Sequence, residues 1–231
     1  MRSLFLFVVL LVFAAVTGSH AQRISRVNYG IDVGTGFGPD IYTPSINYYQ
    51  NLSFGNFRYV SIGWTGRFSG SMISGNPVLK TIGNPGDQDE ISLKRIAAYN
   101  AAFGVTLNFN FEHIEFGANV DLLNLSAGKT SKVLYKIADL EHATDSSTKF
   151  HNKLVTAFPQ MASLLPVSTK KSAGNSEVYM RIWINQEIGI KVGYQLQNVV
   201  YNTKDPLNNG QKRFVHQYGL PFAALSFRIQ N

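Results

Sequence analysis

The sequence predicts an all-β protein: a closed, up-and-down antiparallel transmembrane β-barrel of eight strands. Three observations support this fold class. Apolar and polar residues alternate along eight segments, and short and long links take turns between those segments. The side of each segment opposite the apolar stripe carries mostly Gly, Ala, Asn, Ser and Thr.

The first 21 residues are a predicted secretory signal peptide. Arg2 precedes an apolar run from Leu4 to Val16, and the small residues Ser19 and Ala21 precede the expected cleavage point. The run is shorter than the ~20 apolar residues of a membrane-spanning helix. Residues 22–231 are therefore the expected mature protein, a single domain, and they contain no cysteine, which suits passage through a bacterial periplasm.

The stretch FGVTLNFNFEHIEFGANVDLL shows the alternation most clearly. Phe103, Val105 and Leu107 fall on one side of an extended chain, whereas Gly104 and Thr106 fall on the other. The alternation resumes after Glu112-His113, so the stretch is a predicted hairpin. The eight predicted strands lie at about 24–37, 42–52, 57–69, 94–111, 114–123, 176–185, 187–201 and 213–230.

The links between these strands suggest how they are arranged. Three links are tight turns, at residues 53–56, 112–113 and 185–187, and the links between them are mostly longer. This pattern is typical of an up-and-down barrel with short turns at one end and loops at the other. Long loops are expected near 70–92 and 128–175, and the second is long enough to hold local structure of its own or disorder.

The apolar stripe is predicted to face lipid. A water-facing exterior would carry more Lys and Glu than the small residues found opposite the stripe. From Tyr99 to Phe111 the stripe has aromatic ends and would rise about 30 Å when tilted by ~40°, close to the ~25 Å apolar band of membrane barrels. A soluble lipocalin-like barrel with the stripe inside is the alternative. The predicted lipid-facing residues are Tyr99, Phe103, Val105, Leu107, Phe109, Phe116, Val120, Leu225 and Phe227.

Three passages carry a resemblance to a known group. They are IEFGANVDLLNLSAG at 114–128, NSEVYMRIWINQEIGIKVGYQL at 175–196, and the pair Arg213-Phe214. In these passages the chain resembles small outer-membrane β-barrel proteins of Bacteroidetes-type bacteria. The resemblance implies a location in the bacterial outer membrane and transfers no activity. The chain departs from many such barrels by ending on Asn231 rather than on an aromatic residue.

The inward faces of the predicted strands carry both signs of charge. An eight-stranded barrel has an interior just wide enough for its own side chains. Because an unpaired buried charge costs several kcal/mol, these groups are expected to form ion pairs that plug the lumen. A gated channel is the alternative. The predicted lumen network comprises Arg26, Asp32, Arg67, Glu115, Asp121, Glu177, Arg181, Lys191 and Arg228.

The sequence predicts no catalytic, cofactor or metal site. His142, Asp145, Ser146 and His151 have the residue types of a Ser-His-Asp or Asp-His arrangement, but a polar, solvated loop explains them equally well. The five histidines are scattered without metal-ligand spacing. The glycine-rich GTGFG at residues 34–38 lacks the lysine and the helix of a phosphate-binding loop.

The overall charge also limits the expected partners. Removing the signal peptide leaves 20 of the 21 basic residues against 14 acidic ones, a net charge of +6. The basic residues are scattered rather than arranged in a dense stripe, so nucleic acid is not an expected partner. The expected role is that of a monomer in outer-membrane lipid whose long loops bind a protein or glycan. A barrel-rim hydrolase, acting on lipid or peptide, and a small passive pore are the alternatives.

Overall fold

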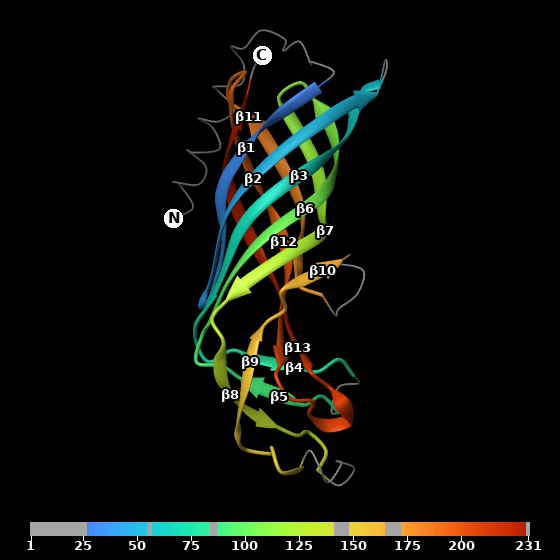
Figure 1. Ribbon diagram of the computed structural model, residues 1–231. Helices are drawn as coiled ribbons and strands as arrows, with labels where there is room; N and C mark the ends of the chain where they lie inside the picture. The colour runs from blue at the N-terminus through green and yellow to red at the C-terminus, as the bar shows by residue number, and fades with distance from the viewer. Residues whose placement is uncertain (1–26, 55–56, 84–86, 141–147, 165–171, 230–231) are drawn as a thin grey trace.

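The computed structural model describes residues 27–54, 57–83, 87–140, 148–164 and 172–229 (Figure 1). The predicted signal peptide and Arg26 lie outside the described residues. The described chain forms thirteen strands and one short 3₁₀-helix, η1 (Asn208–Gly210). No helix in this part of the chain is long and apolar enough to cross a membrane.

All the strands belong to one antiparallel sheet, so the prediction of an all-β antiparallel fold is confirmed. The strands are β1 (Val27–Gly38), β2 (Ile41–Phe54), β3 (Phe57–Ile73), β4 (Val78–Lys80), β5 (Glu90–Ser92), β6 (Ile96–Phe111), β7 (Ile114–Gly128), β8 (Ser131–Lys136), β9 (Leu154–Pro159), β10 (Ala162–Leu164), β11 (Gly174–Trp183), β12 (Ile188–Thr203) and β13 (Arg213–Arg228). The sequence predicts eight strands, whereas the sheet contains thirteen. The five additional strands have three to six residues, too few for alternation to stand out.

The eight longest strands pair in a closed cycle that we call the large ring. Its order is β1, β2, β3, β6, β7, β11, β12 and β13, with each strand antiparallel to the next. The pairing of β13 with β1, from Gly30 opposite Arg228 to Gly36 opposite Phe222, closes the cycle. Each of the eight segments predicted from alternation overlaps one of these strands.

A second, smaller cycle of strands lies at one end of the first, and we call it the small ring. It runs from β4 to β5, β8 and β9, and it is completed by the far ends of β12 and β13. Figure 1 shows β4, β5, β8 and β9 gathered beyond the large ring, with β13 running into them. The regions near 70–92 and 128–175, predicted as loops, therefore contain much of a second ring-like structure.

A local departure from strict alternation occurs in β7. In β7 a register shift places Phe103 of β6 opposite Leu123 and Gly104 opposite Asp121, so Leu122 is the extra residue of a bulge. Beyond it, Leu123 and Leu125 are exposed while Asn124 is buried. The bulge keeps apolar side chains on the outside where unbroken alternation would have turned them inward.

The apolar core lies in the small ring and in the adjoining end of the large ring. In the strands of the small ring, buried and exposed side chains alternate as expected for a sheet with one face in water. Leu79, Val133 and Phe214 are buried, whereas Lys132 and Lys136 are exposed. The core comprises Ile73, Leu79, Ile91, Leu93, Ile96, Ala98, Val133, Tyr135, Ile137, Val155, Ala157, Val199, Tyr201, Leu207, Phe214, Tyr218 and Leu220. The rest of the large ring has a polar, charged interior.

Candidate functional site

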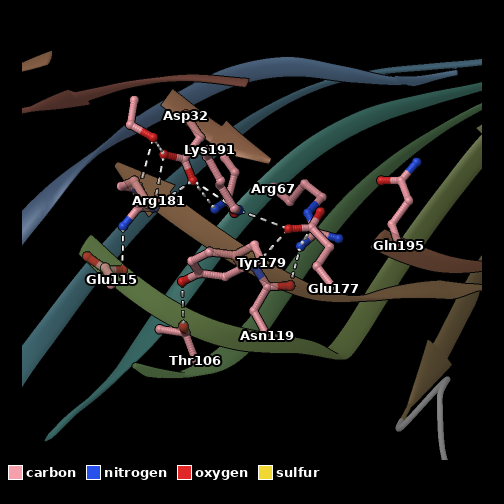
Figure 2. A network of polar contacts seen from close by, with 12 residues as sticks. Asp32, Arg67, Thr106, Glu115, Asn119, Glu177, Tyr179, Arg181, Lys191 and Gln195 are labelled. Atoms are coloured by element: carbon pink, nitrogen blue, oxygen red, sulfur yellow. Dashed lines mark hydrogen bonds and ion pairs between the residues drawn. The ribbon is translucent and has the colours of Figure 1, made fainter. Parts of the chain in front are cut away.

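The interior of the large ring holds a continuous network of charged side chains, shown in Figure 2. Seven charged residues from five strands take part, and all are at least 95 % buried as residues. The network runs in the order Glu115, Arg181, Asp32, Lys191, Glu177, Arg67 and Asp121. Each of these residues is in the predicted lumen set.

Arg181 on β11 is the centre of one half of the network. Its Nη1 donates to Glu115 Oε1 on β7 at 2.5 Å, and its Nη2 donates to both carboxylate oxygens of Asp32 on β1 at 3.0 Å. Its Nε donates to Ser226 Oγ at 2.9 Å, and that hydroxyl donates to Asp32 Oδ1 at 2.7 Å. All three nitrogens of the guanidinium group therefore have acceptors, the condition under which a buried arginine is tolerated.

Lys191 and Arg67 form the other half. Lys191 Nζ lies 3.1 Å from Asp32 Oδ2 and 3.0 Å from Glu177 Oε2, so it joins the two carboxylates. Arg67 Nη2 lies 3.2 Å from Glu177 Oε1, and Arg67 Nη1 lies 3.4 Å from Asp121 Oδ1. These contacts connect β1, β3, β7, β11 and β12 across the lumen.

Neutral groups complete the surroundings of the charges. Asn119 Oδ1 accepts a hydrogen bond from Arg67 at 2.8 Å, and Asn119 Nδ2 donates one to Glu177 at 3.1 Å. The ring of Tyr179 lies 4.1 Å from Lys191 Nζ, within the range of a cation–π interaction. The lumen is thus filled by side chains that shield the charged groups from solvent. Within the described residues, Arg67 Nε and Nη1 donate no hydrogen bond, so the Arg67 half of the network is less completely paired than the Arg181 half.

One predicted member of the lumen set is placed differently. Arg228, near the end of β13, is half-buried and lies with its guanidinium carbon 3.9 Å from the ring centroid of Trp183. Its Nη1 donates to the carbonyl of Gln186 in the β11–β12 turn at 3.5 Å. Arg228 therefore sits at the short-turn end of the ring, where it shares Trp183 with the network: the guanidinium carbon of Arg181 lies 5.4 Å from the same ring centroid. Arg26 lies outside the described residues.

A layer of uncharged polar residues lies between the network and the small ring. Gln195 Nε2 donates to Thr43 Oγ1 at 2.5 Å, and Gln197 Nε2 donates to Ser71 Oγ at 2.6 Å. Tyr218 donates its hydroxyl to Gln197 Oε1 at 2.8 Å. The first two bonds span the lumen between strands that are not neighbours, whereas the third joins paired residues of β12 and β13, so this layer also fills the interior.

Beyond that layer the interior becomes apolar. Ile73 at the end of β3, Ile96 at the start of β6 and Leu220 in the middle of β13 are at least 96 % buried and belong to the apolar core shared with the small ring. Water and ions find neither polar partners nor space in a tightly packed apolar region. The lumen therefore ends against a hydrophobic seal, which the sequence analysis did not predict.

The outer surface of the large ring is apolar. Of the predicted lipid-facing residues all are exposed except Val120, which is half-buried. Aromatic side chains contact one another on this surface, for example Trp64 and Phe103 with ring centroids 5.9 Å apart, and Tyr59 and Phe111 at 6.4 Å. The exterior and interior of the large ring thus have the reverse of the usual polarity of a water-soluble protein.

The residues considered for hydrolytic chemistry are only partly described. His142, Asp145 and Ser146 lie outside the described residues. His151 is half-buried, and its Nδ1 accepts a hydrogen bond from the backbone N–H of Ile137 at 3.1 Å. This bond joins the segment after β8 to the segment before β9. Within the described ranges, no group of three or more His, Cys, Asp or Glu residues could hold a metal ion.

The small ring contains one buried polar pair that the sequence analysis missed. Tyr135 donates its hydroxyl to Asp89 Oδ2 at 2.7 Å, and the N–H of Ala138 donates to Asp89 Oδ1 at 3.0 Å. Burial raises the pKa of the Tyr135 phenol above its usual value, and the hydrogen bond to Asp89 raises this pKa further. The sequence did contain a signal for the inward position of Tyr135, because Val133 and Tyr135 alternate with Lys132 and Lys136.

Comparison with known proteins does not identify the chain: no protein-family model and no curated protein matches it.

Proposed function

We propose that this chain is a bacterial outer-membrane protein with two parts. The large ring is an eight-stranded transmembrane β-barrel closed by its own side chains, and the small ring stands outside the membrane as an interaction module. The observation that carries the proposal is the reversed polarity of the large ring, with Arg181 and Asp32 buried inside and Leu107 and Phe109 exposed outside.

The physical argument rests on the solvent that each surface needs. A soluble monomer rarely exposes an apolar area larger than a few hundred Å², whereas the large ring exposes apolar side chains on all eight of its strands. A bilayer accepts such a surface only if every backbone group is paired internally. The closed cycle of strand pairings in the large ring meets this condition and leaves no free edge, which also favours a monomer.

The connections favour one orientation. In outer-membrane barrels the short turns face the periplasm and the long connections face outward. The turn at Glu112-His113 and the β11–β12 turn lie at the end of the large ring opposite the small ring. The small ring, with Lys132 and Lys136 on its outer face, therefore lies on the cell surface. The resemblance to small Bacteroidetes-type outer-membrane barrels supports the same location.

The closed lumen favours an anchoring role over transport. Three regions lie in series along the interior: the ion-pair network, the layer of uncharged polar residues around Gln195 and Gln197 (the amide layer), and the apolar seal. Such an interior holds the strands together and leaves little bore for a solute. We therefore propose that the barrel anchors the small ring and presents it to a protein or glycan.

Single cysteines test this placement, because the natural chain has none. Lys132→Cys lies on the small ring, and Gln186→Cys lies in a short turn. Leu107→Cys lies in the middle of the apolar outer surface of the large ring, which we call the apolar belt. All three positions are exposed. A membrane-impermeant maleimide should label Lys132→Cys on intact cells and Gln186→Cys only after the outer membrane is opened. Leu107→Cys should react only after unfolding.

The same experiment can contradict the proposal in two ways. Labelling of Leu107→Cys in the folded protein would show that the belt faces water, and the protein would then not be a membrane barrel. Labelling of Gln186→Cys on intact cells, with Lys132→Cys protected, would show that the small ring faces the periplasm. Each variant is first checked for the wild-type shift in gel mobility on heating, so that only folded protein is compared.

A further inference from the structure

The hairpin between β12 and β13 carries a cavity on the small ring. Its volume is about 560 Å³, within the ~300–1,000 Å³ range of small-molecule sites. Its walls come from the ends of β12 and β13, from the link that contains η1, and from Phe158 on β9, which pairs with Asn202. Three of the lining residues are basic: Lys204, Lys212 and Arg213.

These three cations lie close together because of the hairpin register. Arg213 pairs with Asn202, and the N–H of Thr203 donates to the carbonyl of Lys212 at 2.8 Å, so the three basic residues occupy adjacent rungs. Like charges at such positions repel one another. No carboxylate lines the cavity, and within the described residues no ion pair joins any of the three to an acidic residue.

The remaining walls indicate what kind of anion fits. Arginine and lysine favour phosphate oxygens, and a guanidinium group can bind two of them at once. The cavity is much larger than a phosphate ion. It also offers the apolar side chains of Ile82 and Phe158 and the amide of Asn202, which suit the C–H face and the hydroxyl groups of a sugar ring.

We infer that this cavity binds a phosphorylated monosaccharide, with the phosphate held by Lys204, Lys212 and Arg213 and the sugar placed against Phe158 and Asn202. The site lies on the small ring, outside the strands that the barrel proposal places in the membrane. It goes beyond the proposed function, and it can fail while the membrane placement holds.

Calorimetric titration of the folded full-length mature chain in detergent micelles tests the site with three probes: glucose 6-phosphate, glucose and inorganic phosphate. We expect glucose 6-phosphate to bind, inorganic phosphate to bind at least ~10-fold more weakly, and glucose alone to give no measurable heat. Because the cations are exposed or half-buried, raising the ionic strength from ~0.01 M to ~0.15 M should weaken binding of the phosphorylated sugar.

Variants assign the binding to this cavity. Lys204→Gln with Lys212→Gln should weaken glucose 6-phosphate binding at least ~10-fold, and Arg213→Lys should weaken it while keeping the charge. The matched control is Lys132→Gln with Lys136→Gln, which removes the same charge from an exposed face of the same ring and should leave binding within ~2-fold.

Three results would overturn the inference. They are the absence of glucose 6-phosphate binding to the wild-type protein, an equal loss of binding in the control double variant, and equal affinity for inorganic phosphate and glucose 6-phosphate. The last result would assign the cavity to a free anion rather than to a sugar. The heat-shifted gel mobility of each variant shows that the protein compared is folded.

Discussion

The two rings of this protein follow opposite rules of polarity although they share two strands. Along β12, the inward side chain is Lys191 in the large ring and Tyr201 in the small ring, while the outward one is Tyr194 in the first and Asn202 in the second. The spacing of inward residues stays the same, and only their chemistry reverses. The comparison teaches that the strand pattern determines which side chains share a face but not which face is apolar. Under the proposed function, the medium around each ring, lipid or water, accounts for that second choice.

The largest expected effect comes from breaking the buried network. Arg181→Leu leaves the carboxylates of Asp32 and Glu115 buried without their main partner, and such a loss typically costs about 3–5 kcal/mol. The matched change in the small ring is Lys80→Leu, which breaks the exposed Lys80–Glu90 pair of 2.9 Å and should cost at most ~1 kcal/mol. Urea unfolding in lipid vesicles, followed by tryptophan fluorescence, measures both. Equal losses would contradict the difference between the rings.

The next effect tests the medium outside each ring. Leu107 and Leu154 are both exposed leucines, on the large and small ring respectively. Leu107→Arg should lower the unfolding free energy in vesicles by about 2–4 kcal/mol, because it places a charge near the bilayer midplane. Leu154→Arg should change it by no more than ~0.5 kcal/mol, because that side chain faces water. If Leu107→Arg folds as well as the wild-type protein, a soluble fold becomes the better interpretation.

A smaller effect is expected inside the small ring. Tyr135→Phe removes the hydroxyl that donates to Asp89 and should cost about 1–3 kcal/mol, since Asp89 keeps its bond from Ala138 but loses the other. The raised pKa of Tyr135 also gives a pH dependence. Above pH ~10 the unfolded state releases the phenol proton while the folded state retains it, so stability falls as pH rises. The decline should be shallower in Tyr135→Phe, and identical slopes would contradict this role.

The last prediction is that the protein does not conduct ions across a bilayer. Planar-bilayer recordings of the purified protein should show no steady conductance, because Ile73, Ile96 and Leu220 close the lumen at the small ring. Gln197→Ala opens space in the amide layer but leaves this seal in place, so it should not conduct either. Stable, reproducible channels from the pure protein would favour the passive pore instead.

Much of the large ring could be predicted from the sequence. Alternation with a period of two does not depend on which strands pair, so it assigned Asp32, Glu177 and Lys191 to one face and Leu107 and Phe109 to the other before any partner was known. The alternation of short and long links likewise predicted an antiparallel arrangement that closes on itself, and the structure confirms a ring-like closure.

The candidate sites depended on contacts between residues far apart in the chain. That Arg181 bonds Asp32 rather than Asp121 is decided by the register and tilt of several strands together, and the sequence contains no direct signal for either. The basic cavity likewise needs Phe158 of β9 to lie beside the β12–β13 hairpin, although the two are separated by more than forty residues. The catalytic hypothesis for His142, Asp145 and Ser146 stays untested because these residues lie outside the described ranges.

By itself, the sequence determined the faces of the long strands, because side-chain direction in an extended chain is a local property. Only the tertiary structure decided that the links near 70–92 and 128–175 build a second ring. Strands such as β4 and β5 contain three residues each, too few to show a pattern, and are stabilised only by the neighbours that pair with them. The apolar seal has the same origin, since Ile73, Ile96 and Leu220 form a plug only when three strands that are distant in the sequence meet.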